Sequence, residues 1–235
     1  MTEILRTLGE RKIRRLCHFT PSRNFAHILA GQQGILATAR LHQAERQVFN
    51  QTDLQRLDGY DSHICCSIEY PNPYFFAIAR NREVIFRDWV VLMIKPELLC
   101  RDGTLFCATN AATGHGAFVK GGSGACQALF ARSVTSARGE ILRSQSHLAP
   151  CPTDLQAEVL IEDQIPRGAI QGVIFADVSQ VRRELNRLKL AGLTAEGLEL
   201  IVCADMFNRE LLAQQIRNGI RPREQEWTNE ETGNA

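Results

Sequence analysis

The chain has 235 residues, of which 44% are hydrophobic and 23% are charged, and its formal net charge at pH 7 is +1. This composition excludes global disorder and suits one sizeable hydrophobic core. No stretch reaches the roughly 18 to 20 uninterrupted apolar residues that a membrane helix requires, and charges interrupt the N-terminal segment where a secretory signal would lie. We therefore expect a cytoplasmic protein without a membrane segment, with a single domain over residues 1–223 and a flexible acidic tail over residues 224–235.

The charged residues and the cysteines indicate which classes of ligand the chain could bind. A net charge of +1 excludes a protein that holds nucleic acid by bulk electrostatics alone. Lysine supplies only four of the 27 basic residues, so arginine, which suits bidentate phosphate contacts, predominates. The eight cysteines include no CxxC pair and no cluster with zinc spacing. We predict buried, reduced thiols and expect no metal site.

The first part of the chain alternates helical and strand-like segments. Residues 16–20 form a short apolar segment that ends in a turn-prone Pro-Ser pair, and a strand is predicted over residues 63–70, closed by a Pro-Asn-Pro turn. Apolar side chains at helical spacing, preceded by the capping residue Ser22 and ended by Gly31, predict a helix between these two residues. Further helices are predicted over residues 3–15, 40–55 and 73–81.

The second part of the chain contains most of the predicted sheet. Strands are predicted over residues 89–94, 105–110, 157–163, 168–176 and 198–205, the last as an edge strand, and an amphipathic helix over 178–192. The glycine-rich stretch 109–126 is too irregular for either regular structure, and the serine-rich segment 131–153 is expected to be a mobile surface excursion. Short strands with helices to the sides, without regular βαβ alternation, indicate an α+β fold.

A few polar residues stand in positions where chemistry is possible, although each also has a structural explanation. Glu158 lies in a strand pattern that buries its neighbours, which is costly unless the carboxylate is paired or faces a cleft. His18 could be a structural histidine whose ring nitrogens are hydrogen-bonded, Thr20 could cap the next turn, and Arg56 could stand at a helix end. The GGSG stretch at 121–124 lacks the Lys-Ser/Thr of a phosphate-binding P-loop. Taken singly, none of these residues identifies a site.

Four segments in their order along the chain resemble one family. These segments are HFTPSRNFAHILAGQQGIL, RLDG before SIEYPNPYFF, TNAA, and TDLQAEVLI. Together they are similar to the DarT-type nucleic-acid ADP-ribosyltransferases, bacterial toxins that use NAD to modify a DNA base. The resemblance covers about residues 14–175. It implies an ADP-ribosyltransferase-like split β-core with peripheral helices, which holds NAD as co-substrate in its cleft.

The resemblance also implies the catalytic residues. By its place in QAEVL, Glu158 matches the family's catalytic acid, which would orient the nicotinamide ribose, stabilise the charge that develops at C1′ and help remove a proton from the attacking base. Arg56 matches the arginine that grips the NAD diphosphate, with Arg46 as a competing candidate because the spacing in this region does not discriminate between them.

The remaining cofactor contacts follow from the first segment. His18, Phe19 and Thr20 match the HxT segment that contacts the nicotinamide side and the adenosine ribose. Asn24 would add a polar contact from the following helix, and the backbone around Gly34 would pass close to NAD.

The acceptor and the partner are further implications of the resemblance. The SIEYPN and TNAA segments look more like a branch that modifies guanine than one that modifies thymine, and the region 109–150 would read single-stranded DNA. A DarG-like, macrodomain-type antitoxin is the implied partner. Two alternatives stay open, namely the same fold acting on RNA or protein, and a non-catalytic nucleic-acid-binding module for which Glu158 is incidental.

Overall fold

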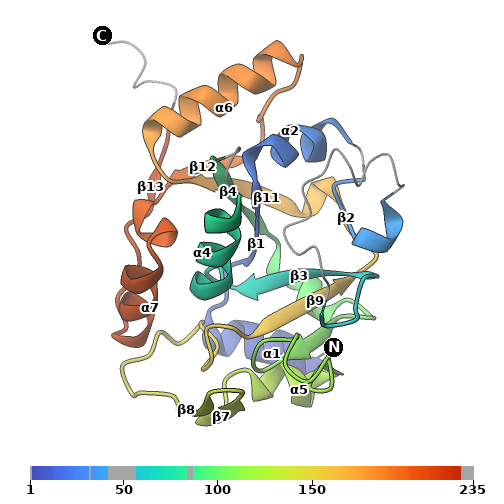
Figure 1. The fold of residues 1–235 in the computed structure, drawn as a ribbon, viewed down its shortest axis with the longest axis vertical. Helices are drawn as coiled ribbons and strands as arrows, with labels where there is room; N and C mark the ends of the chain where they lie inside the picture. Colours follow the sequence, from blue (N-terminus) through green and yellow to red (C-terminus); the bar gives the residue numbers. More distant parts are fainter. Residues whose placement is uncertain (1, 32, 42–56, 84–86, 229–235) are drawn as a thin grey trace.

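The computed structural model describes residues 2–31, 33–41, 57–83 and 87–228. Its centre is a nine-stranded sheet with the order β13-β12-β11-β4-β1-β3-β9-β5-β6, surrounded by helices (Figure 1). The expected α+β class is confirmed. The strands are β1 (Leu16–Pro21), β2 (Ile35–Leu36), β3 (His63–Ile68), β4 (Trp89–Ile94), β5 (Leu105–Cys107), β6 (Lys120–Gly121), β7 (Ser133–Ser136), β8 (Gly139–Leu142), β9 (Glu158–Glu162), β10 (Gln164–Ile165), β11 (Ile170–Phe175), β12 (Glu199–Val202) and β13 (Gln225–Glu226).

The helices lie around the sheet. The α-helices are α1 (Thr2–Arg11), α2 (Ser22–Ala30), α4 (Pro73–Arg82), α5 (Ser123–Ala128), α6 (Val178–Leu190) and α7 (Arg209–Arg217), and the short 3₁₀ helices are η1 (Thr38–Arg40), η2 (Pro96–Cys100), η3 (Arg167–Ala169) and η4 (Ala204–Phe207). The helix predicted over 40–55 falls almost entirely outside the described residues. No helix in the described part of the chain combines the length and the apolar character needed to cross a membrane.

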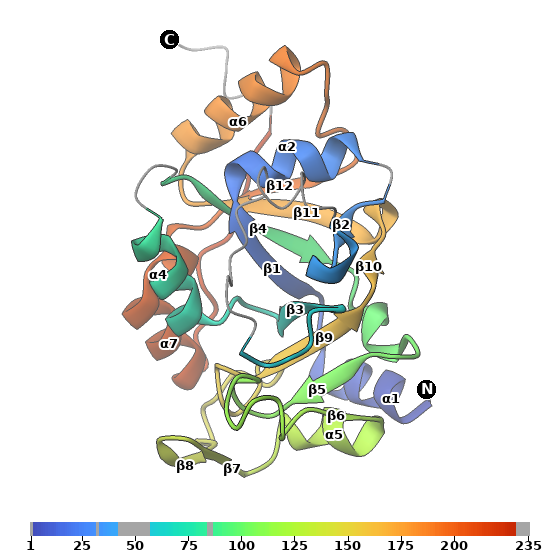
Figure 2. The ribbon, with the colours of Figure 1, turned by 45° about the vertical axis from the view of Figure 1, so that its right-hand side comes forward.

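The sheet is split between β1 and β3. β1 pairs with β4 through all six of its residues, but with β3 only through Leu16 and Cys17. Beyond Cys17 the two strands separate, and β3 continues its pairing with β9 instead. In Figures 1 and 2, β3 and β9 cross the view at an angle to β1 and β4. The split β-core implied by the resemblance is therefore present, and residues 18–20 lie on the part of β1 that has left β3.

Strand β4 is buried on both faces and connects two cores. All six residues of β4 are buried, as the continuous apolar run WVVLMI predicts. Val90, Leu92 and Ile94 belong to a core shared with α2 and α6, whereas Val91 and Met93 belong to a second core shared with α4 and α7. Because side chains alternate along a strand, this one segment fixes the two sides of the sheet to each other.

Two segments that we expected to lack helices and strands contain, between them, some of both. The segment 131–153 contains an antiparallel hairpin of β7 and β8. Its end is fixed by Arg143, whose guanidinium donates hydrogen bonds to the carbonyls of Leu148 and Cys151 at 2.8 Å each. The predicted mobile excursion is therefore wrong. The glycine-rich stretch 109–126 is irregular up to Val119 and then enters β6 and α5.

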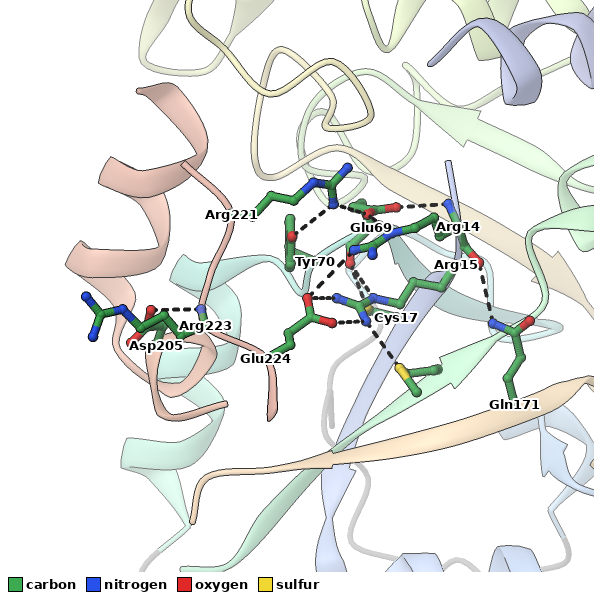
Figure 3. A network of polar contacts seen from close by, with 11 residues as sticks. Arg14, Arg15, Cys17, Glu69, Tyr70, Gln171, Asp205, Arg221, Arg223 and Glu224 are labelled. Carbon is green, nitrogen blue, oxygen red and sulfur yellow. Dashed lines mark hydrogen bonds and ion pairs between the residues drawn. The ribbon is translucent and has the colours of Figure 1, made fainter. Parts of the chain in front are cut away.

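The C-terminal segment is part of the sheet up to Trp227. β13 pairs with β12, so the predicted edge strand 198–205 is covered and is not an edge. Glu224 accepts two hydrogen bonds from the buried guanidinium of Arg15, at 2.9 and 2.6 Å (Figure 3), and Trp227 is buried. The expected flexible tail therefore does not begin at residue 224, because the segment 224–228 is held by a salt bridge and strand pairing.

Glu69 joins this contact into a larger network. Its side chain is fully buried at the end of β3 and accepts hydrogen bonds from Arg14 and Arg221, at 2.9 Å each (Figure 3). Its backbone carbonyl accepts a further bond from Arg15. Burial of one carboxylate among several guanidinium groups holds the start of β1, the end of β3 and the C-terminal segment in one arrangement.

Candidate active site

A cavity of about 300 Å³ opens where β1 and β3 separate. Residues of β1, α2, β2 and β3 line it, together with the loop that follows β5 and the first residue of β9. Of the sequence-predicted residues, those in its lining are His18, Phe19, Asn24, Gly34 and Glu158. Five predicted residues, of which Glu158 is more than 120 positions away from the other four, thus meet at one cavity whose volume suits a small-molecule ligand.

His18 takes the place of a missing strand partner. Its ring nitrogen Nδ1 lies 2.9 Å from the backbone carbonyl oxygen of Cys65 on β3. A carbonyl can only accept, so Nδ1 carries the hydrogen in this contact. The imidazole therefore bridges the gap between the two strands and is held at the cavity wall in a defined orientation.

Phe19 lines the cavity and packs into an aromatic cluster. Its ring centroid lies 4.6 Å from that of Phe76 and 5.9 Å from that of Phe75, both on α4. Such distances are typical of favourable aromatic pairs. The cluster fixes Phe19 as a rigid apolar part of the wall.

Thr20 is the one described member of the predicted set that does not line the cavity. It is buried, and its Oγ1 accepts a hydrogen bond of 2.9 Å from Nδ2 of Asn24. Asn24 does line the cavity, from the first turn of α2. Thr20 therefore orients Asn24, and the direct contact with the cofactor that the resemblance implies for Thr20 stays a prediction.

Gly34 lines the cavity for a reason that its backbone makes clear. Its φ is +77°, and a Cβ placed there would lie 2.2 Å from the carbonyl oxygen of Ile165. Only glycine fits this conformation and this close approach. The contact seats β2 against β10 and brings the segment from Gly34 to Thr38 into the cavity wall.

Glu158 is the first residue of β9 and is partly buried. It stands opposite Cys107 in the pairing with β5, and its Oε1 accepts a hydrogen bond of 3.2 Å from the backbone N–H of Ala111. The carboxylate is thereby held at the cavity by a loop from another part of the chain. The acid therefore lies in the wall of a cleft, as one explanation of its place in the strand expects.

The arginine assignments fall outside the described residues. Both Arg56 and Arg46 lie in the range 42–56, so the choice between them stays a prediction. Leu57 and Asp58, which follow Arg56 directly, line the cavity. In the described part of the lining, Arg82 at the end of α4 is the one arginine or lysine side chain.

Sequence reasoning missed several polar residues of the lining. Asn72 accepts backbone hydrogen bonds from Tyr74 and Phe75 and so caps α4. Asn110 accepts one from Ala112 and turns the loop after β5. The Pro-Asn-Pro turn before an aromatic helix was a usable signal for Asn72, because asparagine followed by proline is typical of a helix start.

The cysteines are structural. Six of the eight are buried, and Cys65 and Cys100 are partly exposed, all without disulfides. Cys17 and Cys66 line the cavity, and burial raises the pKa of Cys17 to about 12 and raises the pKa of Cys66 as well. These two thiols therefore stay protonated at neutral pH. The described residues contain no group of three or more side chains suited to hold a metal ion.

The fold and the site together define a class: an α+β protein with a split sheet, a nucleotide-sized cleft at the split, and a glutamate in the cleft wall. The model of one family, described as "ssDNA thymidine ADP-ribosyltransferase, DarT", matches residues 17–207. The chain belongs to this family, which confirms the resemblance found in the sequence. No curated protein sequence matches the chain.

Solved structures with the same fold agree with this assignment. Thermosipho africanus DarTG in complex with ADP-ribose superposes with a TM-score of 0.57 at 13% identity, over 83% of this chain and 51% of that chain. Thermus sp. 2.9 DarT in complex with NAD+ gives 0.56 at 14% identity, over 83% and 98%. The same Thermus protein in complex with ADP-ribosylated ssDNA gives 0.54 at 11% identity, over 83% and 97%. The chain thus spans about half of the Thermosipho chain and nearly all of the Thermus one.

Proposed function

We propose that this chain transfers ADP-ribose from NAD to a base of single-stranded DNA and releases nicotinamide, and that the base is guanine. The observation that carries the proposal is the meeting of Glu158 and His18 at one cavity of the split sheet, in a chain of the DarT family. Support also comes from the Thermus DarT structures, in which a protein of the same fold binds NAD+ in one case and ADP-ribosylated ssDNA in the other.

Glu158 is the catalytic residue of this proposal. Positive charge develops at C1′ of the ribose as nicotinamide leaves, and a carboxylate held in place stabilises that charge without reorganisation. The same carboxylate accepts a proton from the attacking base nitrogen. Support comes from the hydrogen bond of 3.2 Å from Ala111, which orients one oxygen and keeps the group at the cavity.

NAD binding falls to the other residues of the wall. His18 and Phe19 hold the nicotinamide side and the adenosine ribose, Asn24 adds a polar contact, and the backbone at Gly34 approaches the nucleotide. Thr20 contributes through its hydrogen bond to Asn24. Arg56 grips the diphosphate, a task that a planar guanidinium performs with paired hydrogen bonds.

The loop that follows β5 supplies the surface for DNA. It begins beside Glu158, lines the cavity through Asn110 and Ala112, and exposes Phe118 and Lys120. Exposed aromatic and basic side chains are the features with which proteins hold single strands. An unpaired base reaches the cavity without the cost of flipping it out of a duplex.

Guanine as acceptor rests on the SIEYPN and TNAA segments, whereas the family description names thymidine. Labelled NAD with four single-stranded oligonucleotides, each lacking one base type, tests the choice. Loss of labelling only in the strand without guanine, with the adduct on guanine by mass spectrometry, is the expected result. An adduct on thymine in guanine-free DNA rejects the base, and labelling of RNA or protein without any DNA product rejects the acceptor class.

The partner proposal follows the same reasoning. We expect a toxic activity that a DarG-like macrodomain antitoxin reverses by removing ADP-ribose from DNA. Expression of the chain in bacteria should arrest growth, and co-expression of such a macrodomain should restore it. Growth arrest that is unchanged by a macrodomain active on ADP-ribosylated DNA would reject this partner.

A further inference from the structure

Two buried polar side chains meet beside the catalytic carboxylate without lining the cavity. Thr109 follows β5 and is 3% exposed, and Asp154 precedes β9 and is 2% exposed. The hydroxyl Oγ1 of Thr109 donates a hydrogen bond of 2.8 Å to Oδ2 of Asp154. This bond joins the segment that leads into the DNA-facing loop to the segment that leads into Glu158.

Asp154 shapes the turn from which Glu158 emerges. Its Oδ1 accepts a hydrogen bond of 2.9 Å from the backbone N–H of Gln156, and its backbone carbonyl accepts one of 3.0 Å from Ala157. Glu158 is the next residue along the chain. The course of the backbone into the first residue of β9 is therefore set by Asp154.

Thr109 fixes the segment that carries the backbone N–H bound by the carboxylate of Glu158. Two residues after Thr109, the backbone N–H of Ala111 donates to Oε1 of Glu158 at 3.2 Å. Ala111 is itself buried, and Asn110 turns the loop by accepting from the N–H of Ala112 at 2.9 Å. The position of this N–H relative to Glu158 thus depends on where Thr109 is anchored.

We propose that Thr109 and Asp154 are positioning residues for Glu158, an inference that rests on the catalytic role proposed above. Their hydrogen bond joins the segment that precedes Glu158 to the segment that precedes Ala111, whose N–H orients the carboxylate of Glu158. A bond to a buried carboxylate is strong, and removal of its donor leaves an acceptor oxygen without a partner. When Asp154 loses this partner, the two segments that the hydrogen bond joined shift, so that Glu158 and Ala111 move relative to each other. The contacts of His18 and Asn24 with the nucleotide stay in place.

The test compares two buried threonines at the two ends of β5. Thr109→Val removes the donor to Asp154. Thr104→Val removes a hydrogen bond of similar length, 2.9 Å, which a 5% exposed side chain donates to the neutral carbonyl of Leu98, away from Glu158. We expect Thr109→Val to lower kcat about 10- to 100-fold, the scale of a displacement near 1 Å. The Kd for NAD should stay within about twofold of wild type, and Thr109→Ser should restore most of kcat.

The controls separate positioning from folding. Thr104→Val should keep a wild-type kcat, and circular dichroism should show both valine variants folded. If Thr109→Val does not fold, Asp154→Ala, which removes the acceptor oxygen of the same hydrogen bond, takes its place with the same expected loss of kcat.

Several results would overturn the inference. These are an unchanged kcat in the folded variants, an equal loss in Thr104→Val, no rescue by serine, or a rise in the Kd for NAD as large as the fall in kcat. Failure of the proposed function shows itself separately, because the wild-type chain would then leave DNA unlabelled in the same assay.

Discussion

In the proposed reaction the carboxylate of Glu158 stabilises the positive charge on the ribose. Replacement of Glu158 by glutamine therefore tests the contribution of its negative charge. Glu158→Gln keeps the size of the side chain and an oxygen for the N–H of Ala111. We expect the fold and NAD binding to remain and DNA labelling to fall about 10²- to 10³-fold, because a charge-stabilising group is lost. Labelling by the purified variant at limiting enzyme measures the effect.

The matched control lies on the same strand. Glu162 ends β9 and is exposed, so Glu162→Gln should label DNA at the wild-type rate. Near-wild-type labelling by Glu158→Gln would exclude Glu158 as the catalytic residue.

The arginine prediction concerns the diphosphate. Arg56→Ala should raise the KM for NAD about 10- to 100-fold, since charge-assisted hydrogen bonds contribute roughly 1.5 to 3 kcal/mol. Arg46→Ala should change it little. Rates at limiting NAD compare the two variants, with Arg82→Ala as a third because Arg82 lines the cavity. A larger fall in this rate for Arg46→Ala or Arg82→Ala would assign the diphosphate contact to Arg46 or Arg82 instead.

At the scale of elements, local patterns predicted what depends on local sequence. The apolar segment LCHFT became β1, and the apolar run from Trp89 became β4. The helical spacing after Ser22 predicted α2, although Ser22 is its first residue and Pro21, not Ser22, is at the N-cap. The hairpin of β7 and β8 was missed because both strands have four residues and mostly exposed side chains, so no apolar period marks them.

The C-terminal strand was missed for a different reason. REQEW is polar, and what orders it is the carboxylate of Glu224 against Arg15, which is 209 residues away in sequence. In the same way, predicted residues in the family motifs, such as His18 and Glu158, line the cavity. Asn72 and Asn110 also line it but were missed, because their placement depends on loop geometry. Contacts across long separations leave no periodic signal in the residues themselves.

The C-terminal strand carries its own stability prediction. Burial lowers the pKa of Arg15 and the hydrogen bonds that it donates to Glu224 raise it, with a net increase, so the guanidinium is charged. Glu224→Gln leaves this buried charge without its bidentate carboxylate, at a cost on the order of 3 kcal/mol in the free energy of unfolding. Thermal unfolding should show a Tm lower by about 6 to 12 °C.

The control for that variant is its neighbour on β13. Glu226 is exposed, and Glu226→Gln should unfold at the wild-type temperature. A Tm for Glu224→Gln equal to that of Glu226→Gln would show that the segment contributes nothing through Arg15.

For the whole molecule, the overall charge sets how DNA is engaged. With a net charge of +1 the protein gains little from general attraction to a duplex, and extrusion of a paired base costs a few kcal/mol. Single-stranded DNA that contains guanine should therefore be labelled at least about 10-fold faster than the fully paired duplex of the same sequence. Initial rates on the strand before and after annealing give the ratio, and equal rates would contradict this account.

The separation of β1 from β3 also bears on how the family evolves. The mouth of the cavity is set by the point at which two backbones part, after two residue pairs, and not by any one side chain. Side chains around it can be exchanged while the opening persists, which agrees with the retention of this architecture at 11–14% identity. Distant relatives should therefore be recognised by a strand that pairs along its whole length with one neighbour and along only part of its length with the other, as β1 does with β4 and β3. This backbone feature should persist where the sequence motifs have diverged.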